Sequence, residues 1–374
     1  MVSGGTERCG TTHITREAHR RLQGGCQGGA GARNRPPALR IEPDIFRAMS
    51  LSVRFLGTSA ARPTVERNVS SIAVIREGET LLFDCGEGTQ RQMMRYGISF
   101  ALNDVFITHF HGDHIIGVIG LFRTLALQGR TEPMRMFGPR GATRVLRGAA
   151  QFGVDRVGFP VEITEVAPGE RLARDGYSII PFSTVHSGEV SVGYSLVEED
   201  RKGRFDPELA RSLGIPEGPL WGRIHRGESV TLDDGRVIEP HVLVGPRRSG
   251  RSLAITGDTR PSDATIEAAR GADLLVHEAT FADEEAARAA ETGHSTAREA
   301  ARVAAAAGVR RLALTHFSAR YSRDPGELLR EAREVFDEVV LARDGMELEI
   351  PFPDERVDAA STRAADDPAN SPRS

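Results

Sequence analysis

The sequence predicts a layered α/β fold for most of the chain. Its 374 residues, 39% of them hydrophobic, are enough to bury a large core. Short apolar runs alternate with helical patterns between residues 49 and 352, and this alternation is typical of sheets covered by helices. Several helical patterns begin at a Thr, Ser or Asp, the residue types that cap helix N-termini.

The expected elements follow one another along this region. Strands are predicted at short apolar runs bounded by turn residues, namely 51–56, 71–75, 80–83, 104–108, 178–182, 191–197, 252–256, 273–276 and 311–315. Helices are predicted where apolar residues recur at helical spacing, with examples at 89–96, 115–127, 142–152, 296–307 and 325–336. No internal repeat of fixed period stands out.

Three segments differ from this pattern. Residues 1–48 are rich in Gly and Arg, so we expect a disordered extension, or a stretch upstream of a true translation start at Met49. Residues 353–374 are expected to form a disordered tail. Residues 200–250 are polar and interrupted by Gly and Pro, which inside a compact domain indicates an inserted functional element or a disordered loop.

Composition restricts the function further. The chain has 48 basic and 52 acidic residues, a net charge of −4, and therefore no global positive field that would hold a polyanion. Three cysteines, Cys9, Cys26 and Cys85, argue against a disulfide framework and for a reducing compartment. No apolar run is long enough to span a bilayer, and the N-terminus has no secretory signal, so we expect a cytoplasmic protein without membrane association.

The 200–250 insertion is a local source of positive charge. Its first part, 201–226, has six basic residues against three acidic ones, and it contains Trp221, the only tryptophan of the chain. A basic protrusion with an aromatic side chain is typical of an RNA-contacting arm. A solvated loop whose tryptophan packs into the body fits the same residues nearly as well.

The strongest functional signal is the motif His109-Phe-His111-Gly112-Asp113-His114, directly after a predicted strand. His109 and His111 alternate, so both rings lie on one side of an extended segment, and Gly112 allows a turn that brings Asp113 and His114 to the same space. Imidazole and carboxylate groups at this spacing suit divalent ions such as zinc. Four ligands are too many for one metal that keeps an open position, so a second set of ligands is expected elsewhere.

Later predicted strands end in the same kind of residue. His186, Asp258 and His316 each follow an apolar run. Ligands at the carboxyl ends of separate strands converge at one edge of a sheet, where α/β sites are normally built. Any one of these residues alone is more often an ordinary loop side chain, but together with the 109–114 motif they predict two half-sites.

These ligand positions resemble those of the metallo-β-lactamase superfamily, and smaller motifs are similar, in order, to those of its ribonuclease Z family over about residues 49–351. The smaller motifs are Phe55-Leu-Gly-Thr-Ser59, Asp84-Cys-Gly-Glu-Gly-Thr-Gln90, Gly257-Asp-Thr-Arg260, His277-Glu-Ala-Thr280, Gly293-His-Ser-Thr296 and Thr315-His-Phe-Ser-Ala-Arg320-Tyr321. The resemblance implies a four-layer αβ/βα sandwich with an inserted flexible arm. It also implies an endoribonuclease that removes the 3′ trailer from precursor tRNA, leaving a 3′-hydroxyl on the tRNA and a 5′-phosphate on the trailer.

Two zinc ions per subunit are a further implication of the resemblance. By this resemblance, one ion is bound by His109, His111 and His186. The other is bound by Asp113, His114 and His316, and Asp258 bridges the two ions. Neither ion is saturated by these ligands, which leaves room for a shared water molecule that zinc activates near neutral pH. In the family, Asp113 orients or deprotonates this water.

Several residues receive supporting roles. Asp84, at the end of a strand, is expected to fix the tautomer of a histidine ligand. The family implies that His294 supplies the proton for the departing 3′ oxygen and that His277 and Glu278 brace it. Without the family, a helix N-terminal residue and an ordinary strand-end pair describe these three residues at least as well. Arg320, just past the last ligand, is expected to bind a non-bridging phosphate oxygen.

Contacts with RNA are expected outside the metal site as well. The 200–250 insertion is similar to the family's tRNA-binding arm, which makes Trp221 a candidate contact near its tip. Bacterial relatives are homodimers in which the arm of one subunit holds tRNA for the other, and by analogy we expect a homodimer. The family loop Pro-x-Lys-x-Arg-Asn reads Pro63-Thr-Val65-Glu-Arg67-Asn68 here, so valine replaces the lysine and Arg67 remains as a candidate substrate contact.

Two other functions fit the same residues. With the same fold, the chain could be a phosphodiesterase of small molecules, which has no use for a basic arm; deletion of the arm distinguishes the two enzymes. The third function is tRNA binding without catalysis. A decayed enzyme would be expected to lack at least one of the seven ligands, and all seven are present.

Overall fold

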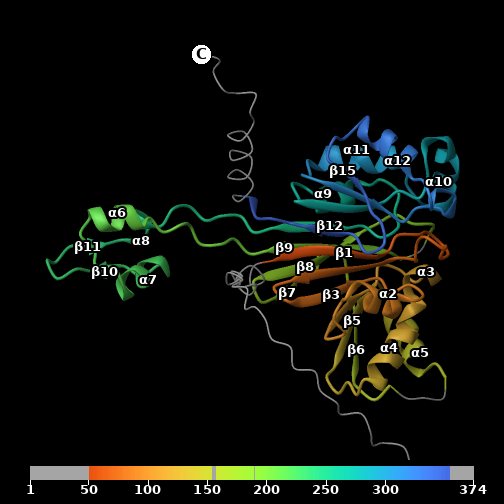
Figure 1. Cartoon of the computed structure of the whole chain (residues 1–374), viewed down its shortest axis with the longest axis horizontal. Helices are drawn as coiled ribbons and strands as arrows, with labels where there is room; N and C mark the ends of the chain where they lie inside the picture. The colour runs from red at the N-terminus through yellow and green to blue at the C-terminus, as the bar shows by residue number, and fades with distance from the viewer. Residues whose placement is uncertain (1–49, 154–156, 189, 354–374) are drawn as a thin grey trace, which may run out of the picture. The chain divides into compact units, whose positions relative to one another are not determined.

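The computed structural model describes residues 50–153, 157–188 and 190–353. It confirms the predicted α/β fold as an αβ/βα sandwich of four layers. Two seven-stranded sheets face each other, and helices cover the outer face of each sheet (Figure 1). Almost all of the predicted terminal extensions lie outside the described residues.

The first sheet has the order β16-β1-β2-β3-β4-β5-β6. Strand β1 pairs antiparallel with β16 and β2, and β2 with β3, whereas β3 to β6 are parallel. The strands are β1 (Leu51–Gly57), β2 (Ser71–Arg76), β3 (Glu79–Phe83), β4 (Asp104–Phe106), β5 (Met134–Gly138), β6 (Val161–Glu165) and β16 (Glu347–Glu349).

The second sheet has the order β15-β14-β13-β12-β9-β8-β7. Strands β12 to β15 are parallel, and β9 is antiparallel to both β12 and β8. Strand β8 therefore runs in the same direction as β12, β13 and β14, and their carboxyl ends share one edge. The strands are β7 (Leu172–Arg174), β8 (Tyr177–Ser183), β9 (Val192–Glu198), β12 (Ser252–Ile255), β13 (Leu274–Glu278), β14 (Leu312–Thr315) and β15 (Val339–Leu341).

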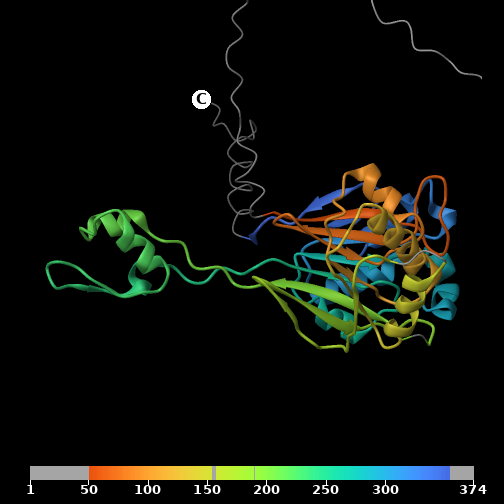
Figure 2. The same cartoon turned by 90° about the horizontal axis from the view of Figure 1, so that it is seen from below.

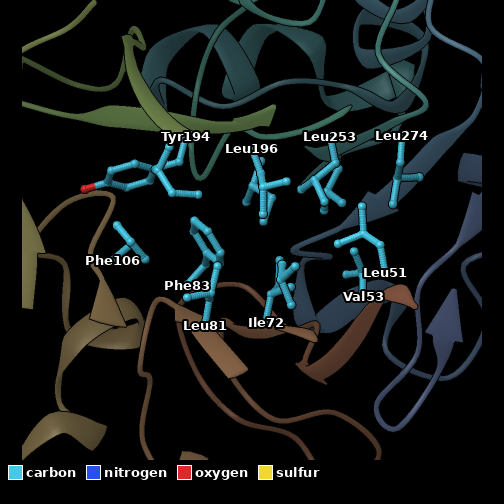
Figure 3. Packing of buried hydrophobic residues seen from close by; sticks show 14 of the residues in the cluster. Leu51, Val53, Ile72, Leu81, Phe83, Phe106, Tyr194, Leu196, Leu253 and Leu274 are labelled. Carbon is cyan, nitrogen blue, oxygen red and sulfur yellow. The ribbon is translucent and has the colours of Figure 1, made fainter. Parts of the chain in front are cut away.

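Buried side chains from both sheets fill the space between them (Figure 3). The rings of Phe83 and Phe106 stack with centroids 4.9 Å apart, and Tyr194 from the opposite sheet packs edge-on against Phe106 at 5.3 Å. The Tyr194 hydroxyl donates a hydrogen bond to the Ile107 carbonyl at 2.8 Å, so this buried polar group is paired. The same bond fixes the segment that leads into the 109–114 motif.

The helices form the two outer layers (Figures 1 and 2). Against the first sheet lie α2 (Thr89–Tyr96), α4 (Gly117–Leu127) and α5 (Ala142–Gln151), and against the second lie α9 (Asp263–Ala268), α11 (Ala297–Ala307) and α12 (Gly326–Arg333). Short elements near the ends of the sheets are α3 (Gly112–Ile115), α10 (Ala286–Thr292), η1 (Asp283–Glu285) and η2 (Ala319–Tyr321). Helix α11 begins with a capping box between Thr296 and Glu299.

The insertion is folded, with a small core of its own. It contains α6 (Pro207–Ser212), α7 (Pro219–His225), the hairpin β10 (Val230–Thr231) and β11 (Val237–Ile238), and α8 (Pro240–Leu243), drawn in green in Figure 2. Trp221 packs against Phe205 in this core, with ring centroids 5.3 Å apart. The alternatives of a disordered loop and of a tryptophan packed into the body are therefore both wrong.

The predicted elements differ from the structure in instructive places. The predicted helix 115–127 is divided into α3 and α4 because the Gly117 amide donates to the Cys85 carbonyl at 2.9 Å instead of continuing the helix. A Cβ on Gly117 would lie 1.9 Å from the Gly86 carbonyl oxygen, so only glycine allows this approach. Strand β4 ends at Phe106, earlier than predicted, because the Thr108 amide donates to the Asp84 carboxylate.

Candidate metal centre

The 109–114 motif connects a strand of the first sheet to a short helix. It follows β4 and runs into α3, whose first turn contains Asp113 and His114. His109 and His114 are buried, Asp113 is half-buried and His111 is exposed. The motif therefore presents ligand-type groups from the interior out to the surface at the edge where the carboxyl ends of β8, β12 and β14 also lie.

Three histidines form the first group of ligand-type atoms. His111 Nδ1 lies 3.1 Å from His109 Nε2 and 3.0 Å from His186 Nε2, and His186 follows β8. Three ring nitrogens this close together cannot all satisfy one another by hydrogen bonding, because a neutral imidazole has one donor and one acceptor. A shared cation would use the lone pairs of all three.

A second group lies beside the first. His316, which follows β14, has its Nε2 atom 3.3 Å from His114 Nε2 and 3.3 Å from Asp113 Oδ2. The His114 Nε2 and Asp113 Oδ2 atoms are 3.6 Å apart. This group has two nitrogen donors and one carboxylate, a more oxygen-rich set than the first.

Asp258 lies between the two groups. Its Oδ2 atom is 3.6 Å from His109 Nε2 and 3.9 Å from His186 Nε2, whereas its Oδ1 atom is 3.3 Å from His114 Nε2 and 3.2 Å from His316 Nε2. Each carboxylate oxygen thus faces one group. Although Oδ1 is buried, it has no hydrogen-bond partner among the described residues. Buried carboxylate oxygens are seldom left in this state, and a metal ion would satisfy it.

The carboxylate of Asp84 fixes the ring of His114. His114 Nδ1 lies 2.7 Å from Asp84 Oδ2, and Asp84 also accepts hydrogen bonds from the Thr108 amide at 2.8 Å and the Thr108 hydroxyl at 2.9 Å. With Nδ1 donating to a carboxylate, Nε2 keeps its lone pair for a metal. Asp84 thus contacts a ligand-type histidine directly, and its role in fixing the tautomer stays a prediction.

Other ligand-type histidines are oriented in the same way. His186 Nδ1 lies 2.8 Å from the Gly293 carbonyl, and His316 Nδ1 lies 2.9 Å from the Thr280 hydroxyl. The Thr280 hydroxyl donates to Glu278 Oε2 at 2.6 Å, so it accepts from His316. In each case an outer partner leaves Nε2 free to face the centre.

The charges of the site are strongly coupled. Burial lowers the pKa of His109 well below its usual value, so this ring is neutral and able to ligate. Burial opposes ionisation of Asp258, yet the neighbouring His316 and His114 hold the pKa of this carboxyl well below its usual range. Burial also acts to lower the pKa of His114, but the carboxylates of Asp258, Asp84 and Asp113 raise it. Such mutual dependence is typical of a site built to hold positive charge.

Backbone strain also marks the site. Asp84 and His316 have φ angles of 55° and 58°, in the left-handed region that non-glycine residues seldom occupy. Ala61, whose amide donates to Asp113 Oδ2 at 2.7 Å, has a φ of 61°. Strained residues of this kind persist where surrounding contacts hold them, and they cluster at functional sites.

A hollow of about 340 Å³ opens onto these groups. Its lining combines apolar side chains with ligand-type residues, namely Ala61, Pro63, Val69, Glu87, His111, Gly112, Asp113, Ile116, Asp258, His294 and His316. A concave site with a few converging polar groups is the usual form of a substrate-binding site.

His294 lies at the edge of this centre, on the loop between α10 and α11. Its Nδ1 atom is 2.9 Å from Glu278 Oε1 and 3.8 Å from Asp258 Oδ2. Asp258, His294 and His316 form a third cluster of ligand-type atoms. His277, by contrast, is fully buried with Nδ1 2.7 Å from the Glu278 carbonyl, and its Nε2 atom has no hydrogen-bond partner among the described residues. Of the predicted pair, Glu278 is the residue that touches His294.

The structure does not bring the three candidate RNA contacts to the hollow. Arg67 is only 8% exposed, and its guanidinium donates to the Ser322 and Ala342 carbonyls and the Thr58 hydroxyl, so it braces the loops instead of facing a substrate. Arg320 forms an ion pair with Glu285. Trp221 belongs to the core of the insertion, and its indole N–H donates to the Ile215 carbonyl at 3.2 Å.

Sequence reasoning missed several residues of the site. Thr108 and Thr280 hydrogen-bond to ligand-type histidines, and Glu87 and Ile116 line the hollow. Thr280 and Glu87 lie within motifs that the sequence singled out, so position within those motifs was the available signal. Arg260 ends the Gly257-Asp-Thr-Arg260 motif, so the same signal was available for it, but its hydrogen bond to the His294 carbonyl at 2.6 Å is a contact that no spacing rule indicates.

Comparisons with known proteins agree with this geometry. A family model described as Anti-Pycsar protein Apyc1 matches residues 51–157, and one described as a beta-lactamase superfamily domain matches residues 240–317. Ribonuclease Z of Gemmatimonas aurantiaca is 64% identical over 314 residues, which make up 84% of this chain and 100% of that protein. Ribonuclease Z of Myxococcus xanthus is 53% identical over 81% of this chain and 99% of its own length.

This chain belongs to the ribonuclease Z family. The crystal structure of the short form of human tRNase Z covers 80% of this chain and 100% of its own, with 29% sequence identity and a TM-score of 0.59. A metallo-beta-lactamase fold protein from Bacillus subtilis, 19% identical with a TM-score of 0.58, shares the fold. Because the chain belongs to this family, its cluster of His and Asp side chains is a metal-binding site. Within the part of the chain that the structure describes, no helix is long and apolar enough to cross a membrane.

Proposed function

We propose that this member of the family is a binuclear zinc endoribonuclease that hydrolyses precursor tRNA at the start of the 3′ trailer. The products are a tRNA with a 3′-hydroxyl and a trailer with a 5′-phosphate. Because the chain belongs to the ribonuclease Z family, its activity is endonucleolytic processing of tRNA 3′ ends. The observation that favours two metal ions is Asp258, whose oxygens face separate ligand groups while one of them lacks a hydrogen-bond partner among the described residues.

The donor set fits two divalent ions. His109, His111 and His186 would hold one, and Asp113, His114 and His316 the other, with Asp258 between them. When bound, such a pair supplies Lewis acidity to the scissile phosphate and lowers the pKa of a water molecule. Mixed imidazole and carboxylate ligands of this number suit zinc.

In this proposal Asp113 orients the attacking water. The Ala61 amide donates to Asp113 Oδ2 at 2.7 Å, which fixes the carboxylate in the lining of the hollow. Although burial acts to raise the pKa of Asp113, His114 and His316 hold it well below its usual value. An ionised carboxylate accepts a hydrogen bond from the water molecule, and this bond orients the water so that the lone pair of the water oxygen faces the phosphorus.

His294 would protonate the departing oxygen. Hydrolysis breaks the bond between phosphorus and the ribose 3′ oxygen, and this alkoxide needs a proton because it is a poor leaving group. Burial acts to lower the pKa of His294, but the adjacent Glu278 carboxylate outweighs it and raises the pKa to about 9. With Nδ1 held by Glu278, the Nε2 proton of the imidazolium remains available to the substrate.

We extend the proposal to the organisation of the chain. Residues 49–352 form the catalytic domain, and residues 200–250 within it are an arm that holds the tRNA body. Its basic residues would contact phosphates, and the folded core around Trp221 would keep them together. As in the bacterial relatives, a homodimer would let the arm of one subunit hold tRNA for the active site of the other.

A cleavage assay on a 3′-extended precursor tRNA, with and without a chelator, tests the proposal. We expect one chelator-sensitive cut with the stated end groups, its loss in Asp113→Ala, and two zinc ions per chain by elemental analysis. Replacement of residues 200–250 by a short linker should abolish tRNA cleavage but leave the hydrolysis of bis(p-nitrophenyl) phosphate unchanged. If the small diester is hydrolysed while the precursor tRNA stays intact, the assignment of tRNA as the substrate is wrong. If the metal-loaded protein hydrolyses neither, the assignment of the catalytic residues is wrong.

A further inference from the structure

The loop that carries His294 is held at every residue. The Gly293 carbonyl accepts from His186 Nδ1, and the His294 amide donates to the Ala289 carbonyl at 2.8 Å. The Ser295 hydroxyl donates to the Thr259 carbonyl at 2.5 Å. Because α10 ends before this loop and α11 begins after it, the position of the His294 ring depends on these individual contacts.

Arg260 connects this loop to the strand end that carries Asp258. One guanidinium nitrogen donates to the His294 carbonyl at 2.6 Å and to Glu299 Oε2 at 2.7 Å, and the other donates to Glu299 Oε1. Glu299 also accepts from the Thr296 amide at 2.9 Å as part of the α11 capping box. The backbone amide of Arg260 donates to the Val185 carbonyl at 2.7 Å, beside His186.

We infer that Arg260 is a positioning residue that fixes the His294 imidazole relative to the scissile bond. This inference rests on the proposed role of His294 as the proton donor. Arg260 is absent from the lining of the hollow, so it acts through His294 and not on the substrate. A rigid bidentate pair with Glu299, plus a third bond to the His294 carbonyl, needs the planar fork of a guanidinium, which a lysine cannot reproduce.

The leaving group of the substrate distinguishes positioning from general structural support. A ribose 3′ oxygen needs a proton as it departs, whereas p-nitrophenolate leaves without one. For Arg260→Ala we expect kcat on precursor tRNA to fall about 10- to 100-fold with KM unchanged, since misplacement of a catalytic group by about 1 Å has an effect of this order. Turnover of bis(p-nitrophenyl) phosphate should fall less than about 3-fold, well short of what general acid catalysis contributes.

Three further variants make the test specific. Arg260→Lys should retain more activity on precursor tRNA than Arg260→Ala, and it replaces Arg260→Ala in the test if that variant fails to fold. Arg270→Ala is the matched control, because Arg270 pairs with Glu267 at an exposed site on the same segment, and it should leave both activities unchanged. In a His294→Ala background, Arg260→Ala should cause no further loss on tRNA, because contacting residues that act as one unit are not additive. Zinc content and thermal unfolding are measured for every variant.

Two results would overturn the inference. One is an equal loss on tRNA and on the small diester with a drop in zinc content, which would make Arg260 a support of the metal site. The other is an additive loss in the His294→Ala background. If His294→Ala itself lowers both activities equally, the proton-donor role is wrong, and this outcome is distinct because it is seen without any change at Arg260.

Discussion

Replacing Glu198 with glutamine should destabilise the sandwich without touching the metal centre. Glu198 ends β9, its side chain is 5% exposed, and it accepts hydrogen bonds from Arg251 Nε at 2.7 Å, from a terminal Arg251 nitrogen at 2.8 Å and from Arg76 Nε at 2.9 Å. Arg76 belongs to β2, so the cluster links the two sheets. Arg251 directly precedes β12, where the 200–250 insertion rejoins the second sheet.

The size of the effect follows from burial. Glutamine preserves the shape of the side chain but removes the negative charge that faces the Arg251 guanidinium, which is 2% exposed. Breaking a buried ion pair by removing one partner costs about 3–5 kcal/mol. We expect the free energy of unfolding to fall by about 3 kcal/mol at pH 7, since glutamine still offers one acceptor oxygen.

The loss should depend on pH in one direction. Burial acts to raise the pKa of Glu198, but the hydrogen bonds and charge of Arg251 outweigh it, and the folded-state pKa lies below its usual value. A lowered pKa contributes stability that is fully present above the unfolded value of about 4.3 and is lost as the pH falls through the folded value. The difference between wild type and Glu198→Gln is therefore expected to be constant from pH 7 to 5 and to shrink below about pH 4.

Urea unfolding followed by circular dichroism at several pH values measures this difference. Glu267→Gln is the matched control, because Glu267 and Arg270 form an ion pair whose side chains are 71% and 62% exposed, and loss of such a pair costs about 0–1 kcal/mol. A loss of less than 1 kcal/mol for Glu198→Gln, or a difference that stays constant as the carboxyl group is protonated, would refute the reasoning.

Two further substitutions test the contacts around the metal ligands. Asp84→Asn keeps a residue type that tolerates the left-handed backbone at this position, but it weakens the hydrogen-bond acceptor for His114. Zinc affinity, measured by competition with a chromophoric chelator, should therefore fall about 10- to 100-fold. An unchanged affinity would contradict the role of Asp84. Gly293→Ala places a Cβ 2.4 Å from the Ser187 amide at a φ of 74°, so the melting temperature and the zinc affinity should both fall, whereas Gly271→Ala, at a φ of 65° in open space, should lower the melting temperature alone.

The sequence was sufficient to predict which ligand-type residues meet. Side chains at the carboxyl ends of strands that run in the same direction within one sheet share an edge, and this rule groups His186, Asp258 and His316 on the second sheet. The 109–114 motif follows β4 of the first sheet, so the packing of the two sheets brings it to them. The residues that orient the histidine rings were harder to predict from the sequence. Thr108 and Thr280 are single threonines whose roles depend on where their hydroxyls point, and strand patterns carry no such information.

Arg67 shows why the substrate contacts could not be predicted in the same way. Its position in a family-like loop suggested a contact with RNA, yet its guanidinium lies 4.8 Å from the centre of the Phe317 ring and donates to the Ala342 carbonyl. Both partners are about 250 or more residues away in sequence. Whether an arginine faces solvent or interior is decided by such long-range packing, not by its neighbours in the chain.

The division of ligands between the sheets predicts that metal ions hold the sandwich together. In each proposed group, two ligands follow β4 of the first sheet and one follows a strand of the second, His186 after β8 or His316 after β14. Asp258 adds a ligand from the second sheet to both groups. Metal ions bound there would therefore link two sheets whose other contacts are largely apolar side chains.

Removal of metal should accordingly lower the stability of the whole fold. An ion that binds only the folded state stabilises it by about 4 kcal/mol at a free concentration 1,000 times its dissociation constant. We expect a chelator to lower the melting temperature, and added zinc to restore it in a concentration-dependent way. Asp258→Asn should show a smaller response, because both groups lose a charged ligand. If the chelated protein kept the melting temperature of the zinc-loaded one, the ligands could not be acting across the two sheets.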